Sequence, residues 1–148
     1  MTSNDFGPGS GPVPGLDAAA WVAGVEDDVQ ARPGTGERAW VWAYAIHALA
    51  HADLMDAGVG ETTDAVWVAP QMAWAMDDLL DAGVRTRAPL VPPVRRDDLP
   101  AAISTGLRRL IATAGVDDPT LPMPLAEACA WTVQRAAKAF HAYAGALP

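Results

Sequence analysis

Apolar residues recur every three or four positions along most of this chain, which is the spacing of one face of an α-helix. No stretch shows the sustained apolar and polar alternation that predicts a β-strand. The pattern predicts five helices: a first capped by Asp17 and reaching about Gln30, a second from the break at residues 32–36 to about Ala57, a third capped by Thr62 or Thr63 and reaching about Ala82, a fourth opened by Asp97 and Asp98, and a fifth after residues 117–124.

The segments between these helices are rich in proline and glycine. Residues 1–15 combine Gly, Pro and Ser and predict a disordered tail. Residues 85–96 carry three prolines and four arginines and form the clearest interior linker, while Pro70 predicts a kink or a late start in the third helix. We therefore expect one all-α domain over residues 16–148, a mostly antiparallel bundle of four long helices and a shorter first one.

Three of the predicted helices end with the same letters. Ala-Gly-Val stands at residues 57–59, 82–84 and 114–116. A glycine just past a helix adopts the left-handed conformation at low cost, and the valine after it packs back on the last turn. The three triplets predict three such helix ends.

The second and third helices also share a longer repeat. Residues 40–59 and 65–84 align with ten identities in twenty positions, which pair Trp42 with Trp67, Asp53 with Asp78 and Asp56 with Asp81. The two helices are therefore interpreted as an internal duplication that forms an antiparallel hairpin.

One stripe of this hairpin carries potential ligands for a soft metal. The second helix presents His47 and His51 at the positions where the third presents Met72 and Met76. If the hairpin turns near residue 61, the two pairs lie at one depth, and imidazole with thioether groups suits Cu(I). The alternative is that both pairs fill space in the core, because methionine is a flexible gap-filling residue.

Residues 77–81 read Asp-Asp-Leu-Leu-Asp, with arginines following at 85 and 87. This stretch resembles the first aspartate-rich motif of class I terpene and isoprenyl-diphosphate synthases. The resemblance implies that Asp77, Asp78 and Asp81 bind Mg²⁺ and that Arg85 and Arg87 contact a diphosphate. No second aspartate-rich motif accompanies it in the sequence, so the resemblance implies a binder rather than a complete catalyst.

Aspartates at the end of a helix also face the negative end of the helix dipole. Both Asp56 and Asp81 stand in such a last turn, so we expect something to compensate them. The simplest partner is a linker arginine, for which the sequence offers Arg38, Arg85, Arg87, Arg95 and Arg96.

The chain contains six tryptophans, and Trp40 and Trp42 lie on opposite sides of the second helix. That helix must therefore be covered on two faces. The stripe Trp42, Ile46 and Leu49 and its repeat through Trp67 and Trp74 form the candidate surface for a protein partner or a second copy. Burial of this stripe inside one chain is the alternative.

Charge and composition exclude some functions. The formal net charge is −8, and the basic residues are scattered, so binding to nucleic acid is not expected. The sequence shows no membrane-spanning run and no secretion signal, and its single cysteine suits a reducing compartment, so we expect a cytoplasmic protein.

These observations favour a non-enzymatic helical interaction or regulatory module, able to form a dimer and needing no cofactor. The alternative is a Mg²⁺-dependent diphosphate or isoprenoid binder built on Asp77, Asp78 and Asp81. A copper-binding bundle that uses His47, His51, Met72 and Met76 is a third hypothesis.

Overall fold

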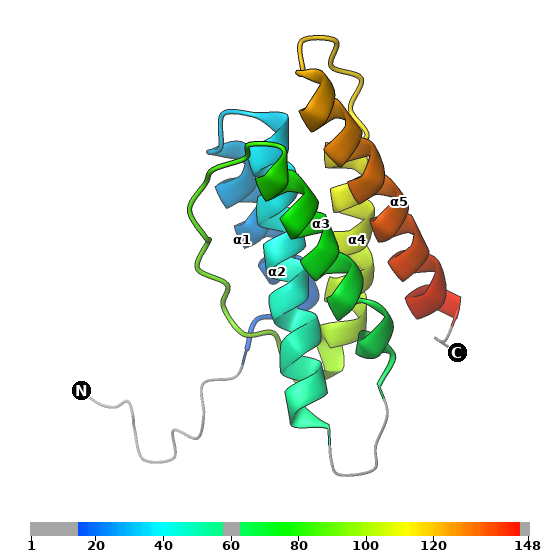
Figure 1. Cartoon of the computed structure of the whole chain (residues 1–148). Helices are drawn as coiled ribbons and strands as arrows, with labels where there is room; N and C mark the ends of the chain where they lie inside the picture. The colour runs from blue at the N-terminus through cyan, green and yellow to red at the C-terminus, as the bar shows by residue number, and fades with distance from the viewer. Residues whose placement is uncertain (1–14, 58–62, 146–148) are drawn as a thin grey trace, which may run out of the picture.

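The computed structural model describes residues 15–57 and 63–145 and shows five helices packed as a bundle (Figure 1). The predicted all-α fold is confirmed. The elements are α1 (Ala18–Gln30), α2 (Thr35–Asp56), the 3-10 helix η1 (Asp64–Trp67), α3 (Ala69–Asp81), the 3-10 helix η2 (Arg96–Asp98), α4 (Leu99–Ala114) and α5 (Met123–Gly145). The predicted tail and the triplet at residues 57–59 fall wholly or partly outside the described residues.

Helix starts follow the sequence signals. The Asp17 side chain accepts a hydrogen bond from the Ala20 amide at 2.7 Å and caps α1. Thr63 caps η1 in the same way, and Pro70 stands in the first turn of α3, where a proline's missing N–H costs nothing. The third predicted helix is therefore split into η1 and α3, the late start that Pro70 predicts.

Helix α2 lies at the centre and contacts α1, α3 and α4. The ring of Trp42 packs against that of Trp21 from α1, with centroids 6.4 Å apart. On another side α4 approaches closely, because a Cβ atom at Gly106 would lie 2.9 Å from Ile46. This close crossing leaves Ile46 fully buried.

A long crossover joins α3 to α4 and runs outside α1 and α2 (Figure 1). Its first part is held by Arg32, which donates to the Thr86 hydroxyl and the Arg87 carbonyl at 2.7 Å each. Its last part pairs with Leu16, whose N–H donates to the Pro93 carbonyl at 2.9 Å. The crossover makes α3 and α4 run in the same direction, whereas α5 runs antiparallel to both (Figure 1).

The helix ends at Gly83 and Gly115 differ despite their shared letters. Gly83 has a φ of 103°, and Val84 donates to the Leu79 carbonyl and packs into the core, as predicted. The prediction is wrong for Gly115, which has a φ of −85°, while Val116 is exposed. There the glycine serves a close approach, since a Cβ atom would lie 2.8 Å from the Ile111 carbonyl oxygen.

Candidate interaction surface

The three aspartates of the 77–81 motif lie at the C-terminal end of α3 in different surroundings. Asp78 is partly buried and accepts a hydrogen bond at 2.9 Å from the Nε atom of Arg135 on α5. Asp77 and Asp81 are exposed. The one carboxylate that faces the protein is thus already paired with a cation.

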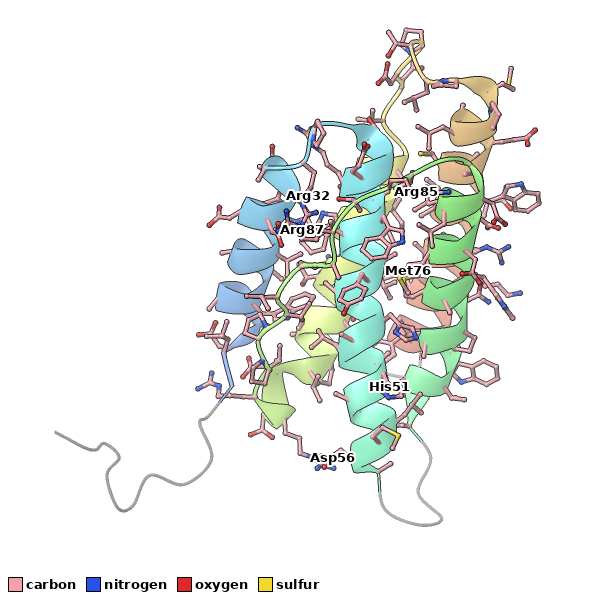
Figure 2. The ribbon with its side chains drawn as sticks, turned by 60° about the vertical axis from the view of Figure 1, so that its left-hand side comes forward. Arg32, His51, Asp56, Met76, Arg85 and Arg87 are labelled. Carbon is pink, nitrogen blue, oxygen red and sulfur yellow. The ribbon has the colours of Figure 1, made fainter. Side chains whose placement is uncertain are left out.

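The two arginines predicted to bind a diphosphate form no ion pair with these carboxylates in the described residues. Arg85 donates to the Leu80 and Val84 carbonyls at 2.8 and 2.6 Å, so it caps the end of α3. Arg87 lies beside Arg32, over α1 (Figure 2). The structure therefore does not bring the five residues of the predicted diphosphate site together.

The predicted arginine partner exists for Asp56, which forms an ion pair with Arg96. At the end of α3 the compensation takes a different form, because Arg85 binds main-chain carbonyls instead of the Asp81 carboxylate. Both arrangements place a cation at the negative end of a helix dipole.

The four residues of the predicted soft-metal site occupy unequal environments. Met72 is fully buried, Met76 and His47 are partly buried, and His51 is exposed. The two imidazole rings stack with centroids 6.1 Å apart, and Met76 lies higher along the hairpin than His51 (Figure 2). Burial, followed by the charge of His51, lowers the pKa of His47 below 6.5.

Among residues 15–57 and 63–145, no group of three His, Cys, Asp or Glu side chains is placed to hold one metal ion. Within the same residues, no helix is long and apolar enough to cross a membrane. An open hollow of about 600 Å³ lies between α1 and α4, and two of the charged residues that line it, Glu26 and Arg109, pair with each other at 2.9 Å.

Large apolar side chains are exposed along η1, α3 and α5. Trp67, Trp74 and Trp131 are 57%, 50% and 53% exposed. Two adjoining hollows of about 220 and 200 Å³ lie between α3 and α5 and share Trp131 as a wall. We call this surface the tryptophan face; it comprises Gln71, Trp74, Asp78, Asp81, Glu127, Trp131, Gln134, Arg135 and Lys138. Trp67 is exposed on η1, which precedes α3 in the chain.

Arg135 holds the centre of the tryptophan face in place. Its guanidinium lies over the ring of Trp74, with the carbon 5.6 Å from the ring centroid, while its Nε atom pairs with Asp78. A cation over an indole face and an ion pair each favour one rotamer of the arginine. The indole of Trp74 is thereby fixed with half of its surface still open.

The sequence predicted only part of this surface. Trp67 and Trp74 are exposed. Trp42, Ile46 and Leu49 are buried inside the chain, so they do not belong to a partner surface, and the alternative of burial within one chain holds for them. They pack inside the chain because α1 and α4 cover that side of α2.

The contribution of α5 to this surface was missed. Its Trp131, Arg135 and Lys138 are spaced four and three apart, which places them on one helix face. That face lies opposite the inner face of α5, on which Cys129 and Ala136 are buried. This spacing is the signal that identifies the outer stripe of α5.

Comparisons with protein-family models, with curated proteins and with solved structures found no match to this chain.

Proposed function

We propose that this chain is a non-enzymatic protein-interaction module and that the tryptophan face is its contact surface. The observation that carries the proposal is that two half-exposed tryptophans, Trp74 and Trp131, line one hollow between adjacent helices. Together they present on the order of 200 Å² of aromatic surface, and the largest apolar patch on a soluble protein, which covers a few hundred Å², is often functional.

The composition of the tryptophan face supports the same proposal. Tryptophan and arginine dominate the residues whose truncation weakens protein complexes most. Trp131 stands in the middle, and polar residues such as Gln71 and Gln134 surround it, which matches the apolar centre and polar rim of protein interfaces. Because Arg135 already fixes Trp74, less side-chain entropy is lost when a partner binds.

Site-specific photo-cross-linking in the cells that make this chain tests the proposal. A photoreactive amino acid replaces the exposed Gln134, and the control carries it at Gln30, an exposed glutamine on α1. We expect discrete adducts of defined mass from position 134 and none from position 30. Equal adducts from both positions, or none from position 134, would contradict the proposal.

A further inference from the structure

The two hollows of the tryptophan face are lined by charges of opposite sign. One is lined by the carboxylates of Asp78, Asp81 and Glu127. The other is lined by Arg135 and Lys138 together with two glutamines. Asp78 and Arg135 pair with each other, which leaves Asp81 and Glu127 in one hollow and Lys138 in the other. Because α3 and α5 run antiparallel, the carboxylates gather toward one end of the face and the cations toward the other (Figure 1).

Such a surface is complementary to itself. A two-fold axis that lies in the interface at right angles to the helices turns the second copy end over end. The acidic end of each copy then faces the basic end of the other, and Trp74 and Trp131 meet their counterparts at the centre. Isologous pairing of this kind is the commonest symmetry of soluble oligomers.

We propose that the partner of the tryptophan face is a second copy of this chain, packed as an antiparallel two-fold dimer. This inference rests on the proposed function and deepens it. The net charge of −8 makes two copies repel each other in most orientations, so local complementarity is needed to select one arrangement.

One pair of charges fixes the register of the dimer. Glu127 and Lys138 are exposed, and neither has an ion-pair partner within the described residues. They stand eleven positions apart on α5, about 16 Å along the helix axis. When the two-fold axis crosses α5 midway between them, beside Trp131, each Lys138 lies opposite Glu127 of the second copy.

The aligned residues of the first copy of the repeat show how such a stripe is covered within one chain. Trp42 and Leu49 of α2, aligned with Trp67 and Trp74, are buried by neighbouring helices of the same chain. At Trp67 on η1 and Trp74 on α3 the same positions remain half exposed. In the proposed dimer the second copy covers this side of α3, just as α1 and α4 cover the corresponding side of α2.

Zero-length cross-linking of the full chain tests this register directly. Lys138 is the only lysine in the sequence, and a carbodiimide joins an amine only to a carboxylate in direct contact. Since about 16 Å separates Lys138 from Glu127 within one helix, a peptide that joins them has to come from two copies. We expect this peptide as the main product of a cross-linked dimer; its absence would overturn the proposal.

Charge reversal gives a second, independent result. Lys138→Glu or Glu127→Lys alone places like charges opposite each other at two points, and we expect each to weaken dimerisation at least tenfold in sedimentation equilibrium. The two reversals together should restore it to within about threefold of wild type. Asp27→Lys on α1 makes the same charge change as Glu127→Lys away from the face and should leave the dimer intact.

These outcomes separate the two proposals. Single reversals without effect, or a double reversal that restores nothing, would overturn the antiparallel dimer. If position 134 captures only a different protein and the wild type stays monomeric, the second copy is excluded while the interaction module stands. If position 134 captures nothing, the interaction module itself fails.

Discussion

The two copies of the repeat have similar sequences and opposite surroundings. In α2 the tryptophan at position 42 is fully buried, whereas its counterpart at position 67, in η1, is 57% exposed. The stripe through His47 on α2 and the matching stripe through Met72 on α3 both belong to the hairpin. The other stripe is covered on α2 and open on α3.

This difference comes from neighbours and not from the repeated residues themselves. Helix α2 is flanked by α1 and α4 as well as by α3, so both of its stripes pack against helices. Helix α3 contacts α2, η1 and α5 in the described part of the chain, and its second stripe faces outward. A duplicated helix at the edge of the bundle thereby keeps an aromatic surface exposed.

The largest expected effect comes from removing the aligned tryptophan from each copy of the repeat in turn. Trp42→Ala should lower the free energy of unfolding by about 3 to 5 kcal/mol, because it deletes a fully buried indole and leaves a cavity. Trp67→Ala should cost less than about 1 kcal/mol in dilute protein. Urea unfolding measures both, and equal losses would contradict the burial assigned to the two copies.

Exchanging the aligned histidine and methionine tests the stripe that both copies bury. Met72→His places a polar ring in a fully buried position without a partner and should destabilise the fold by about 2 kcal/mol or more. His47→Met places a flexible side chain in a partly buried position and should change the free energy of unfolding by less than about 1 kcal/mol. Thermal unfolding measures both. If His47→Met destabilised the fold more than Met72→His does, the two positions would not be packed as described.

The same histidine predicts a small dependence of stability on pH. Burial and the nearby His51 lower the pKa of His47 below 6.5, so the unfolded chain takes up this proton more readily than the folded chain. The contribution of neutral His47 to the free energy of unfolding is complete above pH 6.5 and is lost as the pH falls through the lowered pKa of this residue. It should amount to a fraction of a kcal/mol, because the ring is partly exposed.

Urea unfolding between pH 7.5 and 5.5 measures this slope. His47→Met, which installs the residue of the second copy, should flatten it. A slope that is the same in wild type and His47→Met would rule out His47 as its source.

The smallest expected effect concerns the aspartate-rich end of α3. Because Asp78 is paired with Arg135 and Arg85 caps the helix, we expect Mg²⁺ and pyrophosphate together to leave the unfolding temperature unchanged. A ligand that binds only the folded state raises its stability. A rise with both added that is absent with either alone, and that Asp78→Ala abolishes, would instead support the diphosphate binder.

The fold was predictable because its signals are local. Apolar spacing locates the helices, and Asp17 and Pro70 mark where two of them begin. Gly83 and Gly115 show the limit of such signals, since the same three letters end α3 in a left-handed glycine and α4 in a close main-chain contact.

The tryptophan face was only half predictable because it depends on contacts between distant segments. Nothing near Asp78 indicates that its partner is Arg135, which lies 57 residues further along the chain. Likewise, Trp42 and Trp67 occupy equal positions in the repeat, and only the placement of α1 and α4 decides which of them is covered. The spacing of apolar residues identifies the stripes of each helix but not the helices that cover them.

The most direct test of the account is the mass of the chain in solution. Sedimentation velocity of the wild type and of a Trp74→Ser, Trp131→Ser double variant should give twice the 15.5 kDa chain mass for the first and a single chain mass for the second. A wild type that stays at 15.5 kDa at every concentration, or a double variant that remains paired, would contradict the claim that two copies meet at the tryptophan face.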